Sequence, residues 1–298
     1  MGHRTAGGGS EVSELLNGSR FEDGTDAVAS PAVRVVDVWA GYDQAPALED
    51  VSLEVPRGAL VAIFGPNGGG KSTLLKLIAH ALEPWRGTVE VLGAPAGEQA
   101  KRLAFVTQAE LVDWSFPVSV WDVAMMGRYP ALGLFRRPAA ADRAAVESAL
   151  EQVGMADHRH SQIGALSGGQ RRRAFLARAI AADPELYLLD EPVTGVDVAT
   201  QEDLMELLRR ETERGRTVIS TTHDLAAAAE HFTTVVALNH RVIAMGRSEL
   251  VLDPDVLSRT YGGHMLVLGS NAVVMDDAHH HDTPMGGEQH YHEEGERR

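Results

Sequence analysis

Nine residues, from Gly65 to Thr73, constrain the fold of this chain most strongly. Their sequence, GPNGGGKST, fits the pattern G-x-x-x-x-G-K-[ST] of a turn that binds phosphate. The apolar run 60–64 predicts a buried strand before the turn, and the apolar positions between Leu74 and Ile78 predict a helix after it. Glycines let successive N–H groups point at one anion, and the start of a helix adds partial positive charge there. The sequence therefore predicts a strand–turn–helix unit with a phosphate site.

Each position of this turn has an expected role in holding a nucleotide. Lys71 is expected to reach the β- and γ-phosphates, and Ser72 is expected to hold Mg²⁺. The alternative, a glycine-rich turn that only caps a helix, is disfavoured because every position of the pattern matches. The predicted nucleotide-binding residues of the turn are Gly65, Pro66, Asn67, Gly68, Gly69, Gly70, Lys71, Ser72 and Thr73.

A second apolar run, Leu186–Leu189, ends in the acidic pair Asp190 and Glu191. A strand that ends in this way delivers carboxylates to the edge of an open α/β sheet where ligands bind. Asp190 is predicted to join the Mg²⁺ shell, and Glu191 is long enough to reach an attacking water. Alone, such a pair would be read as a solvated turn, but the phosphate-binding turn in the same chain favours the catalytic interpretation.

Strands and helices alternate along most of the chain, which predicts an α/β fold with a mainly parallel sheet and helices on its faces. The predicted strands are 33–39, 51–55, 60–64, 88–92, 103–107, 186–189, 217–221 and 234–238. A helical block at about 110–182, with helices at 139–153 and 171–182, suggests a separate subdomain inserted into one domain, 31–275. Residues 1–30 and 276–298 are polar and are expected to be a disordered leader and tail.

The composition excludes several classes of protein. The chain has 298 residues, no cysteine and a net charge of -15, which argues against a nucleic-acid binder and excludes disulfides. Residues 1–30 carry two basic and five acidic groups, and residues 276–298 carry two basic and seven acidic groups. No stretch approaches the about 18 unbroken apolar residues of a membrane-spanning helix. Membrane association is therefore expected to come through a partner.

The pentapeptide LSGGQ at Leu166–Gln170 resembles the signature of the ATPases of ATP-binding-cassette (ABC) transporters. The resemblance covers about residues 33–268 and implies an ABC-type phosphate-loop ATPase core, with an antiparallel β subdomain and an inserted helical subdomain. It also implies roles for further residues. They are Tyr42 on the adenine, Gln108 near Mg²⁺ and the attacking water, Ser167, Gly168, Gly169 and Gln170 on the nucleotide, Asp197 at the dimer interface, and His223 on the γ-phosphate.

The same resemblance implies a mechanism in which two copies of the chain face each other head to tail. ATP would lie between Lys71 of one copy and the signature residues of the other, with Mg²⁺ as cofactor. Glu191 would orient water, and His223 and Gln108 would complete the catalytic set. The implied partners are a second copy, integral membrane permease subunits and, indirectly, an extracytoplasmic solute-binding protein, and the implied location is the cytoplasmic face of the membrane.

Three segments indicate which cargo the transporter carries. Asp113–Pro130 and Leu134–Pro138 resemble the ATPases of manganese, zinc and iron importers, as does Tyr261–His264. Met126–Pro130 also resembles the ATPases of iron-siderophore and cobalamin importers, so that alternative stays open. A soluble ABC ATPase that acts without a transporter is less favoured, because the chain has neither a second cassette nor a long coiled-coil insertion.

The C-terminal tail offers a separate hypothesis. Five of the 13 histidines lie there, interleaved with acidic residues. They are His279, His280, His281, His290 and His292. Imidazole and carboxylate suit Zn²⁺, Ni²⁺ or Mn²⁺, so the tail could buffer or sense metal, although a solvated tail with incidental histidines explains the composition equally well.

Overall fold

A computed structural model describes residues 30–107, 117–133, 136–192, 198–262, 265–267 and 273–275 of the 298-residue chain. Contacts divide the chain into Met1–Ser30 and Pro31–Arg298. The fold below is that of the second unit. The predicted leader and tail lie outside the described residues, apart from Ser30.

The central sheet has six strands in the order β10-β9-β3-β8-β7-β6. Their bounds are β3 Leu60–Phe64, β6 Leu103–Val106, β7 Leu186–Leu189, β8 Thr217–Thr221, β9 Thr234–Asn239 and β10 Arg241–Gly246. All neighbours pair in parallel except β10, which pairs antiparallel with β9 at the edge. The predicted mainly parallel sheet is therefore confirmed, and its parallel strands place their carboxyl ends along one edge.

Both faces of the central sheet are covered, as β3 shows residue by residue. Leu60, Ala62 and Phe64 pack into one apolar cluster, while Val61 and Ile63 pack into another on the opposite face. Successive side chains of a strand point to opposite faces. Because both faces are covered by apolar side chains, all five residues are buried. The run is therefore continuously apolar and does not alternate between apolar and polar residues.

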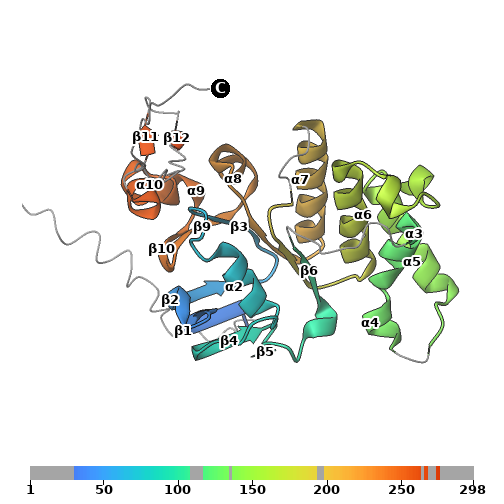
Figure 1. Ribbon diagram of the computed structural model, residues 1–298, viewed down its shortest axis with the longest axis horizontal. Coiled ribbons are helices and arrows are strands. Elements are labelled where there is room, and N and C mark those ends of the chain that lie inside the picture. Colours follow the sequence, from blue (N-terminus) through green and yellow to red (C-terminus); the bar gives the residue numbers. More distant parts are fainter. Residues whose placement is uncertain are drawn as a thin grey trace, which may run out of the picture. The chain divides into compact units, whose positions relative to one another are not determined.

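A second, antiparallel sheet covers one of these faces, with the strand order β2-β1-β4-β5. Its strands are β1 Val33–Tyr42, β2 Ala45–Val55, β4 Arg86–Val91 and β5 Ala94–Pro95. Residues of β1, β2 and β4 share an apolar cluster with β3 and with the helix α2, Lys71–Ile78, which Figure 1 shows beside this sheet. The antiparallel subdomain implied by the family resemblance is thus present, and β1 and β2 are longer than predicted.

The inserted block is helical, and Figure 1 shows it in green beside the β6 edge of the central sheet. Its helices are α3 Val120–Met126, α4 Tyr129–Leu132, α5 Ala140–Gln152 and α6 Gly168–Ala181, with short 3-10 turns at Ala156–His158 and Ile163–Ala165. Gly127 permits α3 to end directly on α6, because a Cβ there would lie 2.1 Å from the carbonyl oxygen of Arg178. α6 begins three residues earlier than the sequence predicted, since Ser167 caps it.

The remaining elements follow the central strands. They are a 3-10 turn Ala100–Arg102, α7 Val198–Glu213, α8 Leu225–His231, α9 Ser248–Val251, α10 Pro254–Tyr261, and the antiparallel pair β11 Met265–Val267 and β12 Val273–Met275. The sequence did not predict β5, β10, β11 or β12. Among the described residues, no helix has the length and apolar character needed to span a membrane.

Candidate functional site

The phosphate-binding turn connects β3 to α2, and its shape depends on glycine. Gly65, Gly68 and Gly70 all have positive φ angles, of 154°, 78° and 94°, which side chains other than glycine rarely adopt. A Cβ on Gly65 would lie 1.8 Å from the carbonyl oxygen of Leu238, and one on Gly70 would lie 2.5 Å from Leu48 Cδ2. The turn is therefore a cradle made of backbone, and side chains at Gly65 and Gly70 would collide with Leu238 and Leu48.

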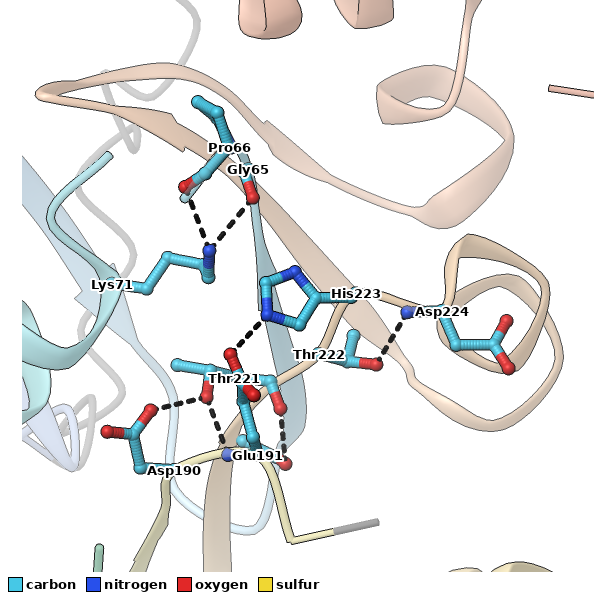
Figure 2. Close-up of polar contacts among 10 residues, drawn as sticks. Gly65, Pro66, Lys71, Asp190, Glu191, Thr221, Thr222, His223 and Asp224 are labelled. Atoms are coloured by element: carbon cyan, nitrogen blue, oxygen red, sulfur yellow. Dashed lines mark hydrogen bonds and ion pairs between the residues drawn. The ribbon is translucent and has the colours of Figure 1, made fainter. Parts of the chain in front are cut away.

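Lys71, the first residue of α2, lies inside this cradle and is only 6% exposed. Its Nζ donates hydrogen bonds of 2.9 Å to the carbonyl oxygens of Gly65 and Pro66, as Figure 2 shows. Burial lowers the pKa of Lys71, and the carboxylates of Glu191 and Asp190 partly oppose this effect. A partly desolvated ammonium thus faces two carboxylates across the turn, which is an arrangement suited to anionic phosphate and a cation.

The two carboxylates come from the end of β7, where Asp190 and Glu191 are 6% and 8% exposed. The hydroxyl of Thr221, at the end of the neighbouring strand β8, holds both residues. It donates to Asp190 Oδ1 at 2.8 Å and accepts from the Glu191 backbone N–H at 2.8 Å. The sequence analysis did not identify Thr221, although its position just before His223 at a strand end was a usable signal.

His223 follows β8 and contacts Glu191 directly, through its Nε2 and Glu191 Oε1. Figure 2 shows the imidazole between Lys71 and the two carboxylates. The next residue, Asp224, caps α8 by accepting from Ala227 N–H at 2.9 Å. The structure therefore brings four predicted site residues, from the ends of two parallel strands and the start of one helix, to the carboxyl edge of the sheet.

The oxygen ligands at this edge fit Mg²⁺. Asp190 uses Oδ1 for Thr221, and its Oδ2 makes no hydrogen bond with any other residue that the structure describes. Ser72 adds a hydroxyl from the first turn of α2. Carboxylate, hydroxyl, water and phosphate oxygens are the ligands that Mg²⁺ prefers. Within the described residues no group of three or more His, Asp or Glu gathers as a metal site.

The signature residues form a second helix start, at α6 in the helical block. Ser167 and Gln170 cap each other, because Gln170 N–H donates to Ser167 Oγ at 3.3 Å and Ser167 N–H donates to Gln170 Oε1 at 3.0 Å. Gly168 is exposed and Gly169 is half-buried, and a Cβ on Gly168 would meet nothing within 4 Å. The start of α6 thus presents open backbone to an anion from outside the chain.

Gly168 and Gly169 also line a cavity of about 520 Å³ together with Asp190, Glu191 and Thr200. Lys71 does not line this cavity. The phosphate turn belongs to the central sheet, between β3 and α2, whereas the signature turn belongs to the helical block, at the start of α6.

Tyr42, at the end of β1, is 45% exposed. Lys76 of α2 donates to its hydroxyl at 3.2 Å and lies 5.4 Å from the centre of its ring. An exposed ring next to the phosphate helix is available to stack on a base, and the role of Tyr42 on the adenine stays a prediction. Two other predicted residues, Gln108 and Asp197, lie outside the described residues.

The fold and the site together define a phosphate-loop nucleoside triphosphatase. It has a phosphate cradle with a buried lysine, paired carboxylates at a strand end and an inserted helical block. Residues 48–194 match the ABC transporter family. The zinc transport system ATP-binding protein TroB of Treponema pallidum (strain Nichols) is 44% identical over 78% of this chain and 88% of its own length. The manganese transport system ATP-binding protein MntB of Bacillus subtilis (strain 168) is 43% identical over 81% of this chain and 97% of its own length.

A solved structure gives the same result. It is described as an inward-facing conformation of a metal-chelate type ABC transporter, is 30% identical, has a TM-score of 0.68, and matches over 78% of this chain and 88% of its own. The chain belongs to the ABC transporter family and is an ATP-binding, ATP-hydrolysing subunit. The predicted family and fold are confirmed, whereas the roles of the individual site residues remain predictions.

Proposed function

We propose that this ATPase energises the import of a divalent metal ion, manganese, zinc or iron, through a membrane permease. The observation that carries the proposal is the identity of 43–44%, over most of both chains, to proteins named for zinc and manganese transport. The chain would work at the cytoplasmic face of the membrane, where it would dock on permease subunits that receive metal from an extracytoplasmic binding protein.

The site geometry supports a hydrolytic role for the four residues at the sheet edge. Lys71 would hold the β- and γ-phosphates of ATP, since its ammonium already lies inside the cradle. Glu191 would orient and polarise the attacking water, and His223, fixed against that carboxylate, would contact the γ-phosphate. Catalysis of this kind consists of positioning and charge stabilisation.

Magnesium would be held by Ser72 and Asp190, and when bound it would neutralise charge on the phosphates. The Thr221 hydroxyl keeps the Asp190 carboxylate aligned for this task. Gln108 is proposed to join the same shell, and Tyr42 is proposed to stack on the adenine.

A second copy of the chain would complete the site. The start of α6 presents exposed backbone at Gly168, whereas Lys71 lies on a different element. We infer that Ser167, Gly168, Gly169 and Gln170 of one copy close over the nucleotide held by the other, and that Asp197 lies at this interface. Binding of ATP would then draw two copies together, and hydrolysis would let them separate.

The cargo is tested by elemental analysis of cells that lack this protein. The cells are complemented with wild type or with Glu191→Gln, and their manganese, zinc, iron, cobalt and nickel are quantified. We expect one of manganese, zinc and iron to fall, and only wild type to restore it. Unchanged levels of these metals, alongside intact ATPase activity, would contradict import of a free divalent ion.

One solved relative, which is described as an ABC transporter of the metal-chelate type, supports a second candidate, transport of a metal chelate. In that case free-metal levels would stay normal in cells grown without the chelate. Growth on an iron-siderophore or on cobalamin as the sole source would then depend on wild type and fail with Glu191→Gln.

A further inference from the structure

The end of β9 forms a floor beneath the phosphate-binding turn. The carbonyl oxygen of Leu238 faces both Gly65 and Gly69, and Cβ atoms there would lie 1.8 Å and 3.2 Å from it. The backbone N–H of His240 donates to Gly69 O at 2.9 Å. A turn built from glycines with positive φ has many conformations available to it, so these contacts limit its freedom.

The C-terminal helix α10 is attached to the same floor. Asn239 lies between Leu238 and His240, and its Nδ2 donates to the carbonyl oxygen of Thr260 at 2.9 Å. Thr260 is fully buried. Asn239 therefore links the last turn of α10 to the strand end on which the phosphate turn lies.

Tyr261 is the residue after Thr260 and ends α10. Its hydroxyl is buried and makes no hydrogen bond of ordinary length and angle with any residue that the structure describes, so it does not hold the turn. Burial raises the pKa of Tyr261 to about 12, and the Gly65 N–H partly opposes this. The hydrogen bond of Asn239 is therefore the side-chain contact that joins α10 to the floor.

We propose that α10 supports the nucleotide site, with Asn239 as a positioning residue that holds the phosphate-binding turn ready for ATP. Asn239 does not touch the reacting atoms. It acts through the floor at Leu238–His240, which contacts the turn at Gly65 and Gly69. A turn that is already ordered binds its ligand more tightly, because less conformational freedom is lost on binding. The inference deepens the proposed function and rests on the phosphate turn being the ATP site.

The test measures ATP affinity and turnover separately on the full chain with Asn239→Ala. The variant removes one hydrogen bond, so we expect the dissociation constant for ATP to rise about threefold to tenfold. Turnover at saturating ATP should stay within about twofold, because Asn239 acts on binding of substrate and transition state alike. Arg259→Ala is the matched control, since Arg259 is an exposed residue of the same helix and, among the described residues, donates to Asp255 O within that helix.

A merely structural role would give a different result, in which melting temperature and turnover fall together while ATP affinity holds. That result, or unchanged ATP affinity in Asn239→Ala, would overturn the inference. Lys71→Ala separates the inference from the proposed site. If Lys71→Ala loses ATP binding while Asn239→Ala binds normally, the site stands and only the role of α10 is refuted. If Lys71→Ala binds ATP like wild type, both are refuted.

Discussion

The imidazole of His223 contacts the carboxylate of Glu191 through Nε2 and Oε1, although 32 positions separate the two residues in the sequence. The contact exists because β7 and β8 are parallel neighbours, with Leu189 opposite Ser220. Both strands end at one edge of the sheet, and the residues that follow them meet there. His223 therefore fixes the direction of the Glu191 side chain, which is the property required of a group that orients water.

The amide variant Glu191→Gln tests this role, because it keeps the size of the side chain and removes its negative charge. We expect turnover to fall at least about 100-fold, the lower range for loss of a general base, while ATP affinity stays within about twofold of wild type. The dimer should accumulate with ATP bound, which size-exclusion chromatography will detect. Glu213→Gln, on the exposed face of α7, is the control. Near-normal turnover in Glu191→Gln, with normal affinity, would refute the assignment.

The charge on Lys71 should make ATP binding sensitive to alkaline pH. Burial lowers the pKa of Lys71 below its usual 10.5, so the free protein loses this proton at a lower pH than an exposed lysine would. Above the lowered pKa the ammonium no longer attracts phosphate, and the affinity for ATP should fall as pH rises. Lys71→Arg keeps its charge throughout, so its weaker binding should not show this step. Equilibrium binding of ATP from neutral to alkaline pH makes the comparison.

The sequence predicted the phosphate turn and the acidic strand end well, because both are local patterns with a fixed backbone context. It did not predict that Thr221 holds Asp190 and Glu191 at once. That contact depends on which strands are neighbours, and strand order is not encoded in any short segment. The same reason explains why Asn239 was not predicted, since β9 and α10 are brought to the turn by tertiary packing.

The sequence also failed to predict several strands and the exact start of one helix. β10 was not predicted, because its residues are only partly buried and the pattern is weak. The start of α6 was placed at 171, although the capping box of Ser167 and Gln170 begins the helix earlier. Gly168 and Gly169 are poor helix formers, so the sequence did not indicate that the helix begins there. The capping box starts the helix at these glycines, which leave the backbone open.

Asp142 should stabilise the helical block in a way that depends on pH. It accepts from Ala139 N–H at 2.9 Å and from Arg128 Nε at 3.0 Å, and Arg128 in turn donates to Ala181 O at 2.9 Å. The Ala139 N–H and then Arg128 lower the pKa of Asp142 below its usual 3.8. For a carboxyl with a lowered pKa in the folded state, the stabilisation is present above the unfolded value and is lost as pH falls through the folded one.

We therefore expect Asp142→Asn to lower the melting temperature at neutral pH, and the difference from wild type to shrink as the pH falls below about 4. Circular dichroism melts across this range measure it. Asp157→Asn, an exposed residue of the same block, should change little. If the difference in melting temperature between Asp142→Asn and wild type is the same at all pH values, the shape of the side chain and not its charge is responsible.

The histidines of the tail, 276–298, provide the last prediction, which depends on sequence alone because these residues lie outside those described. We expect the full chain to bind Zn²⁺ with low affinity and a truncation, 1–275, to lose that binding, because imidazole and carboxylate together are suitable ligands. Calorimetry on both forms tests this. Replacing His279, His280 and His281 by Ala in the full chain separates imidazole from carboxylate, since the acidic residues remain. Identical Zn²⁺ isotherms for the full chain and the truncation would show that the histidines are incidental, and an unchanged ATPase rate in the truncation would show that the tail acts apart from the catalytic site.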